Sequence, residues 1–159
     1  MFKEYCLPLT RKTPPKATVT ADVRHEESFS AQAYTFNHDF LATDGKLHLT
    51  LNTLQTYVTA DGVTVERGIE IVFDADITTG LHAIQNRKVS AAYWKMWREG
   101  DKLRVQTFGA DTGSVDLEFD HENERYDGKF HFRSIGVDGE EIDIDSGRFS
   151  IFGRNDIAL

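Results

Sequence analysis

The last third of the chain alternates between apolar and polar residues, with tight-turn residues separating the alternating runs. A period of two places the apolar side chains on one face of an extended strand and the charged side chains on the other. The pattern therefore predicts an antiparallel sheet with one dry face and one solvated face. The runs that show it best are 115–120, 126–133 and 142–145.

The same alternation predicts strands earlier in the chain. Within 46–52, three leucines alternate with His48 and Thr50, which places these two polar residues on the solvated face. Asp61-Gly62 is a hairpin signal between two apolar runs. The remaining strands predicted in this part are 18–24, 28–36, 55–60, 63–67 and 68–75.

Residues 89–98 combine features of a helix and of a strand. Ser90 is a candidate helix cap and Gly100 a candidate helix end. The dense aromatic residues of this segment favour a strand, and we predict a strand here. Tyr93 and Trp97 then share one face, and Trp94 lies on the other.

The last predicted strand contains a break in its alternation. Its apolar residues are even-numbered up to Ile144 and odd-numbered from Phe149 onward. A slip of one residue would turn the later side chains to the opposite face. Ser146-Gly147 lies at this slip, and glycine adopts backbone angles that suit a bulge. We predict a bulge at this point, or a corner at which the strand changes sheet.

About ten strands with little or no helix predict an all-β fold for this chain of 159 residues. We expect an antiparallel two-sheet β-sandwich, with a closed β-barrel as the alternative. Three prolines at positions 8, 14 and 15 indicate that residues 1–16 form an extended N-terminal arm. Residues 17–159 then form a single all-β domain.

The chain has 26 acidic and 18 basic residues, a net charge of −8. An acidic surface repels phosphate groups, so we expect no nucleic-acid partner, and it favours a basic protein partner. No run of apolar residues reaches the length of a signal peptide or of a membrane span, which predicts a cytoplasmic location. Cys6 is the only cysteine, so no disulfide forms within the chain.

Two short motifs, Asp111-Thr112-Gly113 and Asp145-Ser146-Gly147, resemble the catalytic loops of aspartic proteases. The resemblance implies a hydrolase in which Asp111 and Asp145 share a proton. The same residue types also form turns, and this second interpretation predicts no catalytic residue. Acidic residues at 143 and 145 begin like a calcium loop, but the later ligands of such a loop are missing. We therefore expect neither a metal nor a cofactor.

The only dense aromatic cluster supplies the candidate ligand-binding residues Tyr93, Trp94 and Trp97. Such rings either pack in the core or line the cavity of a small apolar ligand. Exposed edge strands of the expected sheet would also allow a homodimer.

Gly128-Lys129-Phe130 lies in one of the last predicted strands, and Gly147-Arg148-Phe149 lies in the final one. These motifs resemble the small uncharacterised β-sandwich domains that are common among bacterial envelope lipoproteins. The resemblance implies the sandwich fold and no specific activity. Our expectation for function is a non-enzymatic binding module with an acidic sheet face. A small-ligand carrier and an aspartic-type hydrolase are the alternatives.

Overall fold

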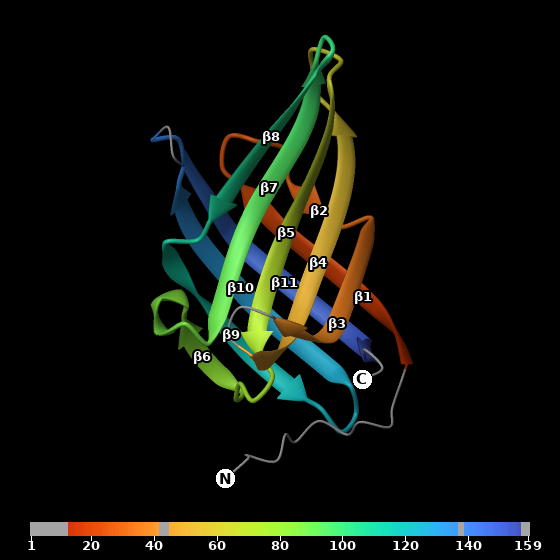
Figure 1. The fold of residues 1–159 in the computed structure, drawn as a ribbon, viewed down its shortest axis with the longest axis vertical. Coiled ribbons are helices and arrows are strands. Elements are labelled where there is room, and N and C mark those ends of the chain that lie inside the picture. The colour runs from red at the N-terminus through yellow and green to blue at the C-terminus, as the bar shows by residue number, and fades with distance from the viewer. Residues whose placement is uncertain (1–12, 42–44, 137–138, 157–159) are drawn as a thin grey trace.

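The computed structural model describes residues 13–41, 45–136 and 139–156. These residues form eleven β-strands and one short 3-10 turn, Ile84–Asn86 (Figure 1). The strands make two antiparallel sheets that pack face to face, which confirms the predicted β-sandwich. No helix within the described ranges has the length and hydrophobicity required to traverse a bilayer.

The first sheet, called sheet A here, lies at the back in Figure 1. In spatial order it contains β6 (Gly80–Ala83), β9 (Thr112–Asp120), β10 (Arg125–Ile135), β11 (Glu141–Asp156), β1 (Thr13–Val23) and β2 (Phe29–Ser30). Sheet B, in front, contains β3 (Ala33–Leu41), β4 (Lys46–Val58), β5 (Thr64–Asp74), β7 (Val89–Glu99) and β8 (Lys102–Gly109).

The two sheets are joined at one corner, where the end of β11 pairs in parallel with β3 at Asn155 and Asn37. The path of paired strands begins at β6 and ends at β8, and these two strands do not pair with each other in the described structure. The sheets therefore do not close into a barrel, so the alternative fold is not formed.

The core lies between the sheets and consists of the apolar residues that the alternation placed inward. Val115 and Leu117 of β9 are buried, as are Ile69, Ile71 and Phe73 of β5. Rings from both sheets meet at the centre of this core, with contacts among Phe36, Phe73, Phe119, Tyr126 and Phe149. Residues 89–98 belong to strand β7, which confirms the strand prediction.

The predicted bulge is present in β11. The register between β10 and β11 shifts after Phe130, which pairs with Gly147, and Ser146 has a positive φ of 49°. A Cβ on Gly147 would lie 2.4 Å from the ring of Phe130, so only glycine fits beside this ring. The bulge turns Ile144 and Phe149 into the same core, where both are buried.

Two sequence-based expectations are wrong in detail. His48 and Thr50 were expected on a solvated face, but only 5% and 7% of their surfaces are exposed. The alternation predicts which way a side chain points, but not whether something lies against that face. His48 Nδ1 lies 3.6 Å from the Oδ1 atom of Asp74 on the neighbouring strand.

Only the last residues of the predicted N-terminal arm, 13–16, belong to the described structure. Strand β1 begins at Thr13, inside the range 1–16, because Thr13 and Lys16 pair with the last part of β11. The register shifts between these two residues, where the two prolines lack the N–H groups that a regular ladder needs. Residues 1–12, and most of the turn predicted at 43–45, lie outside the described residues.

The hairpins β4–β5 and β7–β8 extend beyond the strands of sheet A and form the projecting end at the top of Figure 1. Their inner face is not covered by a facing strand of sheet A there, so the two layers of the sandwich end at different heights.

Candidate functional site

The three predicted ligand-binding aromatic residues lie on two different faces of strand β7. Tyr93 is fully buried in the core, and its hydroxyl donates a hydrogen bond to Glu26 Oε1 at 2.7 Å. Trp97 is on the same face, where the ammonium of Lys95 lies 5.8 Å from its ring centroid. Trp94 is on the opposite face and lies over Gly68. The three rings therefore do not line one common cavity.

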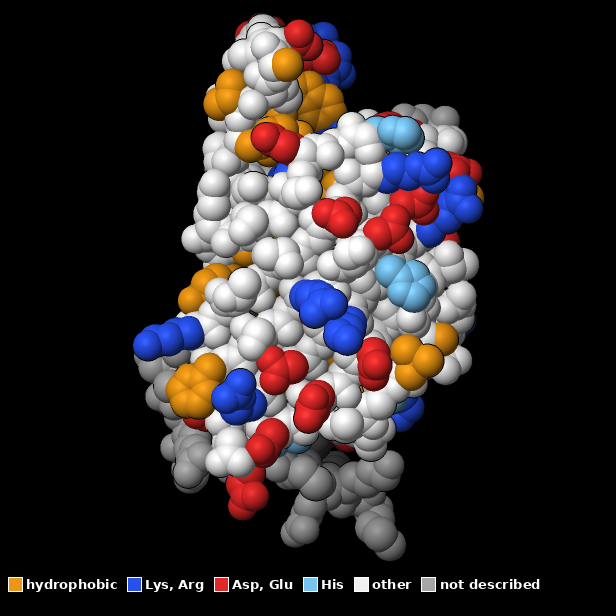
Figure 2. Space-filling view, turned by 180° about the vertical axis from the view of Figure 1, so that it is seen from behind, with side chains coloured by type: hydrophobic (Ala, Val, Ile, Leu, Met, Phe, Trp, Pro, Cys, Tyr) orange, Lys and Arg blue, Asp and Glu red, His pale blue; other side chains and the backbone are white. Residues whose placement is uncertain are grey.

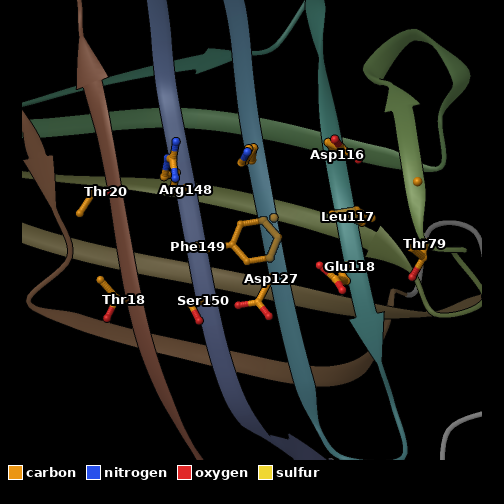
Figure 3. Close-up of a pocket in the computed structure, with 13 residues that line it drawn as sticks. Thr18, Thr20, Thr79, Asp116, Leu117, Glu118, Asp127, Arg148, Phe149 and Ser150 are labelled. Atoms are coloured by element: carbon orange, nitrogen blue, oxygen red, sulfur yellow. The ribbon is translucent and has the colours of Figure 1, made fainter.

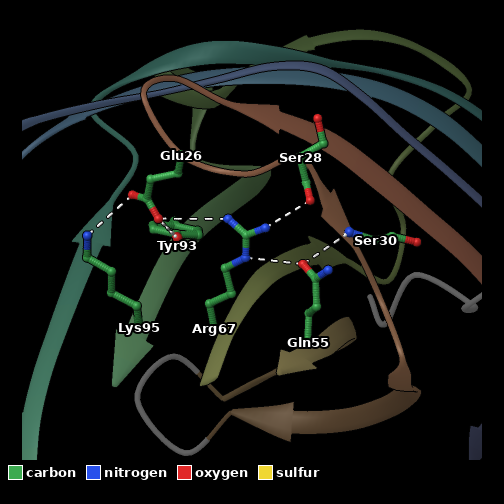
Figure 4. Close-up of polar contacts among 7 residues, drawn as sticks. All are labelled: Glu26, Ser28, Ser30, Gln55, Arg67, Tyr93 and Lys95. Carbon is green, nitrogen blue, oxygen red and sulfur yellow. Dashed lines mark hydrogen bonds and ion pairs between the residues drawn. The ribbon is translucent and has the colours of Figure 1, made fainter. Parts of the chain in front are cut away.

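A polar network joins β4, β5 and β7 to the link between β1 and β2 (Figure 4). Its centre is Arg67 of β5, whose side chain is fully buried. The Arg67 guanidinium donates hydrogen bonds to Gln55 Oε1 at 3.1 Å and to the Ser28 carbonyl at 2.9 Å. It lies 4.4 Å from the ring centroid of Tyr57 and 5.6 Å from that of Phe29.

Glu26, in the link between β1 and β2, supplies the negative charge of this network. Its carboxylate accepts hydrogen bonds from Tyr93 and from Lys95 Nζ, and it lies 3.8 Å from Arg67 Nη1. Burial, together with this carboxylate, raises the pKa of Tyr93 well above its usual value. The network gives hydrogen-bond partners to Arg67 Nε and Nη2 and to the Tyr93 hydroxyl, while Arg67 Nη1 has only the ion-pair contact with Glu26, and we assign the network to stability.

The two aspartates of the protease-like motifs have separate surroundings. Asp111 lies in the link that carries the chain from β8 to β9, and its carboxylate accepts a hydrogen bond from the backbone N–H of Ile135 at 2.8 Å. Asp145 is at the bulge of β11 and pairs with Asp22 of β1. The hydrogen bond at Asp111 ties the link between the sheets to the end of β10, which is a structural role.

A small depression near this link contains Ser114 and His131, which are directly opposite each other on β9 and β10. Ser114 Oγ lies 3.5 Å from Nδ1 of the exposed His131. No carboxylate lies within ion-pair distance of His131 among the described residues, so nothing orients the imidazole as a catalytic base. The described residues also contain no group of three or more side chains that could hold a metal ion.

A shallow groove of about 650 Å³ lies on the outer face of sheet A (Figure 3). Four neighbouring strands, β1, β11, β10 and β9, form its floor. One row across these strands contains Thr20, Arg148, Lys129 and Asp116, and the next contains Thr18, Ser150, Asp127 and Glu118. We call this depression the sheet A groove.

The sheet A groove contains two directly opposed pairs of like charge beside one unlike pair, Lys129 and Asp116. Asp127 is directly opposite Glu118, and Lys129 is directly opposite Arg148. Like charges at opposed positions destabilise a sheet by about 0.2–1 kcal/mol. Neither these four side chains nor that of Asp116 forms a hydrogen bond or ion pair within the described structure.

The surface around the groove carries charges of both signs. Figure 2 shows acidic and basic side chains side by side across this face of the molecule. The sheet face that was expected to be acidic therefore carries charges of both signs here. Its acidic residues in the groove are Glu118, Asp127 and Asp116. The alternation had placed each of these side chains outward, but the sequence carried no signal for the strand register that brings them together.

Comparisons with known protein families, with curated proteins and with solved structures find no match to this chain. The function is therefore argued from the geometry of the sheet A groove.

Proposed function

We propose that this protein is a non-enzymatic binding module whose sheet A groove holds an extended, charged segment of a partner protein. The observation that supports it is the direct opposition of Glu118 and Asp127 in a groove where neither carboxylate has a partner. A sheet that tolerates this repulsion on its own face gains stability when a cationic group of a partner binds between the two carboxylates.

The spacing of the groove charges suggests the chemistry of the segment. Asp127 and Lys129 are two positions apart on β10, which separates them by about 6.6 Å along the strand. An extended peptide repeats its side chains on one face at the same interval. A segment with a basic residue and an acidic residue at positions i and i+2 therefore places its cation at Asp127 and its anion at Lys129.

The test is a fluorescence-polarisation titration with a labelled Ser-Arg-Ser-Glu-Ser peptide. We expect binding that weakens as salt is added, because exposed ion pairs are screened. The double variant Glu118→Gln/Asp127→Asn removes two ion pairs of about 0.2–1 kcal/mol each. This loss corresponds to binding that is about two-fold to thirty-fold weaker.

The matched control is Asp61→Asn/Glu66→Gln, which removes the same charge from two exposed residues of the β4–β5 hairpin. This variant should bind the peptide like the wild type, and a Ser-Gln-Ser-Gln-Ser peptide should not bind. Equal weakening by the groove variant and by its control would show that only net charge matters. No binding of the charged peptide by the wild type at low salt would contradict the proposal directly.

A further inference from the structure

The edges of the two sheets are protected unequally. Three strands pair with a single neighbour in the described structure, namely β2, β6 and β8. β2 has two residues and β6 has four, whereas β8 has eight. Short edge strands offer few free backbone groups, and a long exposed edge strand is a template for another strand. β8 contains neither a proline nor a bulge that would prevent such pairing.

The hairpin geometry determines which residues of β8 face the open edge. Gly100-Asp101 forms a two-residue loop, with a φ of 61° at Gly100 and Glu99 paired with Lys102. At the other end of the ladder, Ala110 N–H donates to the Ala91 carbonyl. Hydrogen-bonded and non-hydrogen-bonded pairs alternate along an antiparallel ladder. Between these two ends, the backbone groups of the even-numbered residues of β8 therefore form hydrogen bonds with β7. The backbone N–H and C=O groups of residues 103, 105 and 107 therefore lie in the plane of the sheet and point toward its open edge.

The side chains of these same residues form an apolar stripe on the outer face of sheet B. Leu103 and Val105 expose 55% and 58% of their surfaces. The half-buried Met96 and Trp94 of β7 continue the stripe, because they are directly opposite Val105 and Thr107. The open backbone groups and the exposed apolar side chains thus occur at the same positions of β8, which is the combination that strand addition requires.

We propose that β8 pairs with β8 of a second copy of this chain, antiparallel and about a two-fold axis that passes through Val105. In this register Val105 is opposite its own counterpart, and Leu103 is opposite Thr107 of the second copy. Arg104 is opposite Gln106 of the second copy. Within each copy Arg104 is already paired with Glu99 at 2.9 Å, and Gln106 Nε2 donates a hydrogen bond to Glu140 Oε2 at 3.2 Å. No two like charges of this strand are opposed, so the strand is complementary to itself.

The resulting dimer joins the two B sheets into one continuous sheet. The contact uses an edge of sheet B, whereas the proposed peptide site lies on the outer face of sheet A. The two proposals can therefore fail independently. In a two-fold pair the same residues are buried in both copies, which is how most homodimers are built.

Sedimentation velocity tests the dimer. The wild type should sediment as a species of twice the chain mass of 18.0 kDa, in a concentration-dependent equilibrium with the monomer. Val105→Lys places two ammonium groups opposite each other at the axis and should weaken the dimer at least ten-fold. Leu81→Lys is the matched control, because Leu81 is 71% exposed on the edge strand β6 of the other sheet, and it should leave the dimer unchanged.

A cross-linking experiment tests the register. In a Cys6→Ser background, Val105→Cys places two thiols at opposed positions, with Cβ atoms about 4.5–5.5 Å apart. Leu103→Cys places them four positions apart along the strands, at about 13 Å. A short bismaleimide should link the first variant and not the second. A wild type that is monomeric up to its solubility limit, a Val105→Lys variant that dimerises unchanged, or equal cross-linking of both cysteine variants would overturn the proposal.

Discussion

Arg67 offers the sharpest test of how the buried polar network stabilises the fold. Its guanidinium is fully buried, donates to Gln55 and to the Ser28 carbonyl, and lies near the carboxylate of Glu26. We consider the substitution Arg67→Met, which keeps an unbranched side chain but removes the charge and every donor. Glu26 then keeps its contacts with Tyr93 and Lys95 but loses the nearby guanidinium.

The expected cost follows from the contacts that are lost. Each hydrogen bond from a charged donor contributes about 1.5–3 kcal/mol. The stacking of the guanidinium on Tyr57 adds about 0.5–2 kcal/mol. The methionine side chain restores part of this stabilisation by packing. We therefore expect the free energy of unfolding to decrease by about 3–5 kcal/mol, the range found when one partner of a buried ion pair is removed. For a chain of this size, this loss corresponds to a decrease in Tm of about 6–20 °C.

Urea unfolding followed by tryptophan fluorescence measures this loss, because both tryptophans lie on β7, next to β5. The double variant Glu26→Gln/Arg67→Met removes both charges and should be about 1–3 kcal/mol more stable than the sum of the two single effects predicts. An Arg67→Met protein within 1 kcal/mol of the wild type would refute the reasoning, as would strictly additive effects in the double-variant cycle.

Three further predictions concern single positions. Glu118→Gln should raise the free energy of unfolding by about 0.2–1 kcal/mol, because it removes the repulsion with Asp127. A lower free energy of unfolding than that of the wild type, measured by urea unfolding, would contradict this. Gly68→Ala should lower the free energy of unfolding by about 1–3 kcal/mol, since its Cβ would lie 2.2 Å from a backbone oxygen of β4, whereas Gly109→Ala meets nothing within 4 Å and should melt like the wild type. Burial lowers the pKa of His121 below its usual value, so the unfolded chain takes up a proton first as the pH falls below about 6.5. Stability should therefore decrease between pH 7.5 and 5.5, and His121→Gln should show a smaller decrease over the same range.

Local patterns in the sequence determined the class of fold and the direction of most side chains. Alternation with a period of two depends only on neighbouring residues, so it could be followed along 115–120 and 126–133 without any knowledge of the partner strands. The bulge was predictable for the same reason: the parity of apolar residues changes at a single point, Ser146-Gly147, where glycine is present.

Only the tertiary structure decided which strands are neighbours, and the candidate sites depend on this. The opposition of Glu118 and Asp127 follows from the register of β9 against β10, and the open edge of β8 follows from its place at the end of sheet B. The burial of His48 and Arg67 was equally hidden, since a polar residue in a strand reads as solvated until the surface packed against it is known. The register between two strands depends on the geometry of the link that joins them or on contacts between distant segments, whereas the alternation reports only the direction of side chains along one strand.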